Sequence, residues 1–365
     1  MGQNYNEVIE GMTLGRLKEI LRSIRDIKVG LLGDICLDIY WRADMTKSEL
    51  SRETPHFPLP VVEEWASPGG GGNALANISA LKPSKIYTTG VIGDDWRGAL
   101  LLKELKKRDI DTSKILLSST RVTPSYCKPL RKGISDTEYE DPRIDFDNYS
   151  PISSEDEERI LDYLGEIADS SDVLCICDQL KFGCVTEKVI KEINEVLCKK
   201  IKIVVDSRNR IDSYRNVILK PNEIEGMKPY ISKEKEGTSS IDEQISASLK
   251  LNISNNAEVC MTLGERGCLY CKGRDQLMYI PSYRVELPID ICGAGDTFLS
   301  AFSCALAAGA KEYEAVVFAH LASNVVLKKI GMTGTAEGKE IIDAFEKVYN
   351  DSGSNIHFPV YILNI

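Results

Sequence analysis

The sequence predicts an α/β protein with a mostly parallel central sheet, helices on both faces of that sheet, and a small β lid. Short apolar runs alternate with helical stretches along most of the 365 residues. Such continuously apolar runs are typical of parallel strands, which are buried on both faces. Several runs end in aspartate, at the edge where open α/β sheets collect ligands. Two intervals interrupt the alternation, and we interpret them as the lid.

The elements follow one another as repeated strand–helix units. Residues 1–27 are predicted to be an amphipathic helical extension because apolar residues recur there at helical spacing. A main domain is expected over residues 28–348 and a C-terminal tail over 349–365. We expect strands at residues 28–34, 86–92, 173–177, 202–206, 217–220 and 259–263. A Gly-rich turn should enter a helix within residues 68–81, and further helices are expected at residues 97–108, 155–168, 186–198 and 241–251.

The two intervals outside this pattern are residues 36–66 and 119–149, which are rich in Thr, Tyr, Pro and charged residues. They contain β-like runs at residues 60–62, 124–130 and 143–146. We expect these runs to form a small sheet that stands off the main domain. A lid of this kind excludes water and positions a substrate.

Composition narrows the function classes. The net charge of −10 disfavours a nucleic-acid partner. No apolar run reaches the length of a membrane span, and the N-terminus lacks the pattern of a signal peptide. The cysteines number eleven and lie in apolar contexts, which indicates reduced thiols in a cytoplasmic protein. The C-x-x-C pair at Cys268 and Cys271 is interpreted as part of a strand, with no metal.

The most informative segment is residues 290–298, where Gly293, Ala294 and Gly295 precede Asp296 and an apolar helical run. Small residues let backbone N–H groups approach a ligand closely. A helix N-terminus adds free donors and a positive dipole, so the turn suits an anion. Asp296 would then lie beside the anion, as a base acting on a hydroxyl that attacks phosphorus. The alternative interpretation is a plain helix N-cap.

A second Gly-rich segment covers residues 68–77. Gly69 and Gly70 allow close backbone approach, and Asn73 and Asn77 lie one helical turn apart, where they could bind sugar hydroxyls. A flexible turn and a dinucleotide fingerprint are the alternatives. The fingerprint is disfavoured because it must follow directly on a buried strand, and polar residues precede this segment.

Aspartates follow several of the predicted strands. Asp34 and Asp38 lie four residues apart after the first strand, and Asp178 follows the strand at residues 173–177. Carboxylates at such places suit polyol hydroxyls, and turn capping is the alternative for Asp34 and Asp38.

Both Gly-rich segments resemble signatures of the ribokinase-like (PfkB) sugar kinases. Residues 290–298 are similar to D-[TV]-x-G-A-G-D-[TS]-F, with Cys292 where that family often has Thr or Asn. The resemblance implies a ribokinase-like fold and ATP-dependent phosphorylation of a sugar hydroxyl. It implies that Asp296 is the base and that the backbone of residues 293–295 forms the anion hole. It also implies sugar contacts from Gly69, Gly70 and Asn73.

The same resemblance implies a nucleotide site with Mg²⁺. Asn222 and Glu225 match the family's N-x-x-E motif, in which the glutamate holds Mg²⁺ through water, although Pro-Asn-Glu alone is more often a helix N-cap. The family's T-x-G-x-x-G nucleotide loop is matched by Thr262, Gly264 and Gly267, a segment that alone is an ordinary hairpin-type turn. The resemblance adds Asn324 to the nucleotide contacts and a monovalent cation such as K⁺ near Asp290. No P-loop motif occurs.

Within the family, the heptose-phosphate kinase domains resemble this sequence most. Their G-D-x-x-L-D-x-Y pattern matches residues 33–40, and R-L-D-F-E is similar to residues 143–147. Their S-D-Y-x-K-G pattern is only partly kept at residues 177–182, and the H-x-G-H motif of the bifunctional members does not occur. This resemblance implies a phosphorylated sugar as acceptor, with Lys128 and Lys181 as basic partners beside Asp178. A nucleoside kinase and a non-catalytic sugar- or nucleotide-binding regulator are the alternatives. A homodimer through the lid is expected because a projecting small sheet exposes an edge.

Overall fold

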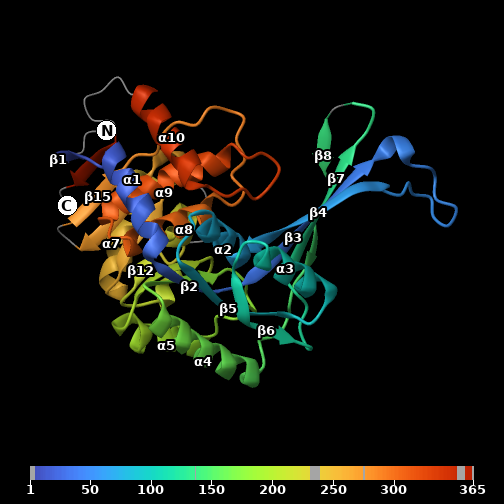
Figure 1. Ribbon diagram of the computed structural model, residues 1–365, viewed down its shortest axis with the longest axis horizontal. Coiled ribbons are helices and arrows are strands. Elements are labelled where there is room, and N and C mark those ends of the chain that lie inside the picture. The colour runs from blue at the N-terminus through green and yellow to red at the C-terminus, as the bar shows by residue number, and fades with distance from the viewer. Residues whose placement is uncertain (1–4, 136, 231–238, 274–275, 352–357, 364–365) are drawn as a thin grey trace.

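Two sheets organise the chain (Figure 1). The computed structural model describes residues 5–135, 137–230, 239–273, 276–351 and 358–363. The larger sheet contains β1 (Tyr5–Glu10), β2 (Lys28–Gly33), β5 (Lys85–Gly93), β6 (Asp111–Ser118), β10 (Val173–Asp178), β11 (Lys202–Ser207), β12 (Ile218–Leu219), β13 (Glu258–Thr262), β14 (Cys268–Gly273), β15 (Gln276–Ile280) and β16 (Pro359–Leu363). Its order is β1-β16-β15-β14-β13-β12-β11-β10-β2-β5-β6. Pairings from β6 to β13 are parallel, and those from β13 to β1 are antiparallel.

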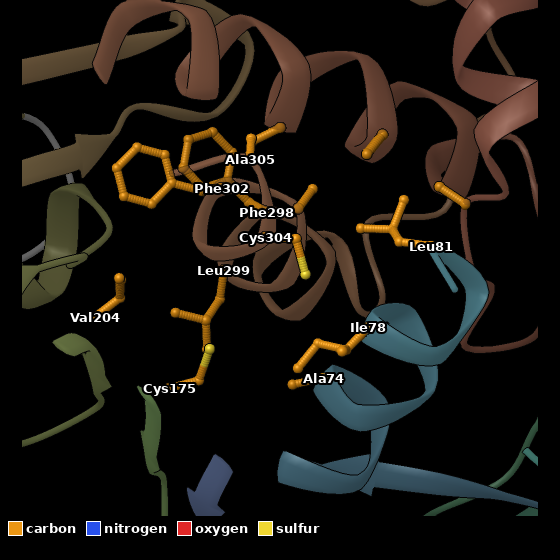
Figure 2. Packing of buried hydrophobic residues seen from close by; sticks show 14 of the residues in the cluster. Ala74, Ile78, Leu81, Cys175, Val204, Phe298, Leu299, Phe302, Cys304 and Ala305 are labelled. Carbon is orange, nitrogen blue, oxygen red and sulfur yellow. The ribbon is translucent and has the colours of Figure 1, made fainter. Parts of the chain in front are cut away.

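Helices cover both faces of this sheet and create two apolar cores. One face carries α1 (Leu14–Ser23), α2 (Gly71–Ala80), α3 (Trp96–Lys106), α8 (Ala294–Ala307), α9 (Glu312–Leu327) and α10 (Gly338–Asp351). The other carries α4 (Ser154–Ser170), α5 (Glu187–Glu195) and α7 (Ile241–Asn255). Figure 2 shows Leu299 of α8 beside Cys175 of β10, with Ala74 and Ile78 of α2 nearby. The predicted fold class is confirmed.

The smaller sheet has the order β4-β3-β7-β8, with β9 also paired to β7. Its strands are β3 (Ile35–Asp44), β4 (Val61–Gly70), β7 (Ser125–Lys132), β8 (Glu138–Glu140) and β9 (Ile144–Phe146). They come from the two intervals predicted to form the lid, and Figure 1 shows most of this sheet extending away from the larger one. β4 leads directly into α2, so the strand and the Gly-rich segment are continuous.

The prediction of a helical extension at residues 1–27 was wrong for its first part. Residues 5–10 form β1, which pairs with β16 at the edge of the larger sheet. The apolar repeat that suggested a helix begins only at Leu14, where α1 begins and buries Leu17 and Ile20. The tail predicted at residues 349–365 likewise supplies a strand of the sheet. Residues 1–4, 352–357 and 364–365 of these two segments lie outside the described residues, and the domain limits at 28 and 348 stay a prediction.

The cysteines are all free, as the sequence predicted. Cys268 and Cys271 lie in β14, and no group of three or more His, Cys, Asp or Glu side chains among the described residues could hold a metal ion. No helix in the described part of the chain has the length and apolar character of a membrane span.

Candidate active site

The site is built around the N-terminus of α8. Gly293 is the N-cap with a φ of 77°, a conformation that favours glycine. A Cβ at Gly293 would lie 2.6 Å from Nδ2 of Asn73, so glycine also lets α2 approach. Ala294 donates its N–H to the carbonyl of Ile291 at 3.3 Å. In the described residues, the N–H groups of Gly293 and Gly295 find no acceptor, which leaves two donors for an anion.

Asp296 lies in the first turn of α8 and contacts α2. The amide of Asn73 donates to Oδ2 of Asp296 at 2.8 Å, and the hydroxyl of Thr297 donates to Oδ1 of Asn77 at 3.0 Å. These contacts join α2 to the first turn of α8. Burial raises the pKa of Asp296 to about 7, while the hydrogen bond from Asn73 opposes this rise. A carboxyl group with this pKa can take up a proton near neutral pH.

A buried ion pair lies at the ends of β11 and β12, on the side of the sheet that faces α8. Nζ of Lys220 is 3.0 Å from Oδ2 of Asp206, and both side chains are almost fully buried. Both charges act on the pKa of Asp296: Asp206 raises it and Lys220 lowers it. Sequence reasoning assigned no role to Lys220, although it directly precedes the Pro-Asn-Glu motif. The sequence gives no sign that Lys220 is buried, and its burial is what distinguishes it in the structure.

Asn222 and Glu225 form a capping box at α6 (Glu223–Met227). Oδ1 of Asn222 accepts the N–H groups of Ile224 and Glu225 at 2.9 and 2.8 Å. Oε2 of Glu225 accepts the N–H of Asn222 at 2.9 Å. Burial and the nearby Asp206 raise the pKa of Glu225. Both residues therefore act as a helix cap in this structure.

The lid contributes a cluster around Asp38. Nζ of Lys128 lies 3.5 Å from Oδ2 of Asp38 and donates to the hydroxyl of Tyr40 at 3.2 Å. Burial raises the pKa of Asp38, and Lys128 opposes this rise. The ring of Tyr40 stacks on Trp65 with 5.1 Å between the centroids. A Cβ at Gly69 would lie 3.1 Å from Oδ1 of Asp38, so this glycine leaves room for the carboxylate.

Gly70 ends β4 with a φ of 54°, and a Cβ there would lie 2.8 Å from the carbonyl oxygen of Asp34. This close backbone contact turns the chain from the lid into α2.

Asp34 does not join Asp38, although the sequence suggested that they act as a pair. Its carboxylate accepts the backbone N–H groups of Gln179, Leu180 and Cys184 at 2.9, 2.7 and 2.8 Å. Burial raises the pKa of Asp34 to about 6, despite these three hydrogen bonds. In this structure Asp34 holds the loop that follows β10, and its role as a sugar ligand stays a prediction.

The other two candidates near this loop are also separate from the lid cluster. The carboxylate of Asp178 accepts the hydroxyls of Ser207 and Tyr214 at 2.7 and 2.9 Å and pairs with Arg210. Lys181 is exposed, with Nζ 5.2 Å from the ring centroid of Phe182.

The candidate nucleotide loop joins β13 to β14. Gly264 and Gly267 have φ angles of 59° and 105°. A Cβ at Gly267 would lie 2.2 Å from the carbonyl oxygen of Ile280. Thr262 donates its N–H to the carbonyl of Pro221 at 2.9 Å, which places this loop beside the Asn222 segment.

Asn324 and Asp290 make contacts of their own. The amide of Asn324 donates to the carbonyl of Tyr283 at 3.4 Å. Asp290 accepts the N–H groups of Cys292 and Gly331, each at 2.9 Å, and so fixes the segment before the anion turn.

The residues present suit Mg²⁺ held mainly through water. Mg²⁺ keeps several of its waters and takes only one or two carboxylates, and Glu225 with Asp206 supplies that charge. Burial and Asp206 raise the pKa of Glu225, and the ammonium of Lys220, which pairs with Asp206, lowers it.

Comparison with known proteins identifies the family. The family model described as pfkB family carbohydrate kinase matches residues 44–338. The chain belongs to this family and is a carbohydrate kinase. It is 28% identical over 352 residues to the "Bifunctional protein HldE" of Trichlorobacter lovleyi, covering 93% of this chain and 67% of that protein. It is 29% identical to the protein of the same name from Geobacter metallireducens, covering 93% of this chain and 67% of that protein. This chain thus spans about two thirds of their length.

Solved structures show the same fold. Arabidopsis thaliana ribokinase complexed with ribose and ATP aligns with a TM-score of 0.65 at 18% identity, covering 87% of this chain and 98% of that one. Phosphofructokinase-2 from Escherichia coli in complex with fructose-6-phosphate aligns with a TM-score of 0.66 at 17% identity. The alignment covers 88% of this chain and 99% of that one. The fold of this family member is therefore ribokinase-like, as expected from the two signatures.

Proposed function

We propose that this kinase transfers the terminal phosphoryl group of ATP to a hydroxyl of a sugar phosphate. The observation that carries the proposal is Asp296, which has a pKa of about 7 and lies in the first helical turn beside two free backbone donors. A carboxylate next to an anion site is unfavourable unless its charge is used. A general base needs this negative charge, because the carboxylate removes the proton of the attacking hydroxyl.

Each group then has one role in the transfer. Asp296 takes the hydroxyl proton while the hydroxyl oxygen forms a bond to phosphorus and the bond from phosphorus to the ADP oxygen breaks. The N–H groups of Gly293 and Gly295 stabilise the charge on the transferring group. Asn73 holds the Asp296 carboxylate in place. Glu225 would hold Mg²⁺ through water, and that cation neutralises phosphate charge when bound. Asn222, Thr262 and Asn324 are the proposed nucleotide contacts.

The acceptor is proposed to be a phosphorylated sugar, with a heptose phosphate as the first candidate. Asp38 at the base of the lid can accept sugar hydroxyls, while the ammonium of Lys128 beside it supplies positive charge. Two anionic substrates in one cleft repel each other, so such a cation is needed. The similarity to the proteins named HldE supports the same choice.

A coupled assay of ADP release over sugars, sugar phosphates and nucleosides tests this function. We expect turnover with a sugar phosphate at a kcat/KM at least about tenfold above that of any free sugar or nucleoside. Ribose, fructose or a nucleoside at the top of that ranking would overturn the choice of acceptor. Absence of ADP release with every compound would count against the proposed transfer itself.

A further inference from the structure

Asp34 lies between β2 and β3, and its carboxylate is enclosed by the loop that follows β10. The residue is only 3% exposed. Oδ2 accepts the N–H groups of Gln179 and Leu180, and Oδ1 accepts the N–H of Cys184. These three charge-assisted hydrogen bonds fill most of the acceptor capacity of a carboxylate. Asp34 therefore lacks both the exposure and the free acceptor positions that a direct sugar ligand needs.

The loop of residues 179–184 is shaped around this carboxylate. A Cβ at Gly183 would lie 2.0 Å from Oδ1 of Asp34, so only glycine leaves room for the charged group. On another side of the loop, the guanidinium of Arg121 donates to the carbonyl of Phe182. Contacts before and after Lys181 therefore fix the backbone that carries this lysine.

Asp34 also connects the loop to the rest of the candidate site. Its carbonyl accepts the N–H of Gly71, the first residue of α2, at 2.9 Å. α2 carries Asn73, which donates to Asp296. The chain continues from Asp34 into β3, which carries Asp38. One residue thus joins the loop, the helix that contacts the proposed base, and the lid strand that carries Asp38.

The place of the loop in the sheet is suited to ligand binding. The loop begins at the carboxyl end of β10, the edge at which open α/β sheets bind ligands. α8, whose N-terminus forms the anion turn, packs on the same strand (Figure 2). Lys181 is exposed in this loop and is the one basic residue in its sequence. A lysine has a flexible four-carbon chain, so a fixed backbone restricts the region that its ammonium can reach.

We propose that Asp34 is a positioning residue for the acceptor: it holds the loop so that Lys181 meets the phosphate of the sugar phosphate, and it does not touch the sugar. The proposal rests on the proposed acceptor and on the proposed role of Lys181. A sugar ligand and a positioning residue behave differently once Lys181 is removed. The effect of a ligand on sugar hydroxyls is independent of that lysine, whereas the effect of a positioning residue disappears with it.

The test is a double-variant cycle on the KM for the sugar phosphate found in the screen. Asp34→Asn keeps the shape of the side chain but puts an NH2 group where an oxygen accepts N–H groups, so at least one loop hydrogen bond is lost. We expect it to raise the KM for the sugar phosphate about tenfold and to leave the KM for ATP within about twofold. In a protein that already carries Lys181→Ala, the same change should raise the sugar-phosphate KM less than about twofold. A full tenfold rise on that background, or no rise in the single variant, overturns the proposal.

Asp172→Asn is the matched control. Its carboxylate also accepts a backbone N–H, that of Lys28 at 2.7 Å, but at the opposite ends of β2 and β10. The control should leave both KM values within about twofold of the wild type. A rise in the sugar-phosphate KM equal to that of Asp34→Asn would overturn a role specific to the loop.

Hydrogen exchange measures the loop itself in protein without substrate. The amides of Gln179, Leu180 and Cys184 should exchange at least about tenfold faster in Asp34→Asn than in the wild type, because they lose their acceptor. Unchanged exchange at all three amides would overturn the proposal.

Gly183→Ala is a second route to the same change. The added methyl group displaces the Asp34 carboxylate from the loop and alters no group that binds a substrate. It should reproduce the selective rise in the sugar-phosphate KM and its loss on the Lys181→Ala background. Thermal unfolding shows whether each variant is folded. If Asp34→Asn does not fold, Gly183→Ala decides by the same criterion.

Failure of the proposed function is distinguishable from failure of this inference. If Lys181→Ala leaves the KM for the sugar phosphate unchanged, the proposed role of Lys181 is wrong and the role of Asp34 falls with it. If Lys181→Ala raises that KM while Asp34→Asn and Gly183→Ala do not, only the role of Asp34 is wrong.

Discussion

Protonation of Asp296 should affect both the activity and the stability of the protein. Its pKa is raised from 3.8 to about 7, chiefly by burial. Because the base must be ionised, kcat/KM should fall about tenfold per unit as the pH drops below 7. The folded state binds the proton more tightly than the unfolded state. The stability that Asp296 contributes is therefore fully present below pH 3.8 and is lost as the pH rises through about 7.

Thermal unfolding tests the predicted effect of Asp296 on stability. Asp296→Asn removes the cost of a buried charge, so at pH 8 the variant should have a higher Tm than the wild type. The difference should shrink toward pH 4. Equal Tm differences at both pH values would contradict the raised pKa.

Lys128 and Lys181 test the choice of acceptor. Replacing either with Ala should raise the KM for a sugar phosphate about tenfold or more and leave the KM for ATP within about twofold, because each removes a cation proposed for the acceptor. Lys250→Ala is the matched control for Lys181, since each lysine is exposed and lies over an aromatic ring, 5.3 Å for Lys250 and 5.2 Å for Lys181. Parallel increases in both KM values would argue against a role in acceptor binding.

The role of a residue could be predicted from the sequence when its partners lie close to it along the chain. Gly293 and Asp296 could be assigned together because the turn, the donors and the carboxylate lie in one segment. The surroundings of Asp34 could not be predicted, since the N–H groups that it accepts belong to a loop about 145 residues later. Lys220 was missed for a similar reason: a lysine in a sequence gives no sign that it is buried.

At the level of elements, the site depends on how closely α2 approaches α8. Gly293→Ala would place a methyl group 2.6 Å from Nδ2 of Asn73 in a backbone conformation that Ala rarely adopts. We expect kcat to fall at least about tenfold because Asn73 and Asp296 separate, together with a loss of about 1 kcal/mol or more in the free energy of unfolding.

Gly165→Ala is the matched control for this change. Gly165 lies within α4, where an added Cβ meets nothing within 4 Å. This variant should be more stable by about 1 kcal/mol and equally active. Full activity of Gly293→Ala with the same acceptor would show that the close approach of the two helices is not needed.

The elements themselves differed in how clearly the sequence marked them. Buried strands such as β10 and amphipathic helices such as α4 were predicted because their apolar pattern continues over several residues. β1 has no such pattern, since it is a short edge strand whose partner is β16 at the other end of the chain. Pairing over that separation leaves no local signal.

At the scale of the whole molecule, we predict a homodimer formed through the small sheet. Exposed apolar side chains gather on its strands and loops: Phe57, Leu59, Val61, Val62, Tyr139 and Ile144. A second copy would cover both this apolar surface and the free sheet edge. Sedimentation at micromolar concentration should give the mass of a dimer.

Val62→Lys should convert the dimer to monomer, because it puts a charge into the proposed interface. Ile253→Lys is the matched control, since Ile253 on α7 is 50% exposed and Val62 is 51% exposed. A wild-type monomer, or equal effects of the two substitutions, would rule out this interface.

The central claim is that Asp296 removes the proton of the acceptor hydroxyl during phosphoryl transfer. The most direct measurement compares Asp296→Asn with the wild type in kcat for the best sugar phosphate and in Kd for ATP. The amide has the shape of the carboxylate but cannot take the proton, so kcat should fall by about 10²–10⁴-fold while the Kd for ATP stays within a few-fold. A variant that keeps more than about half of the wild-type kcat would contradict the claim.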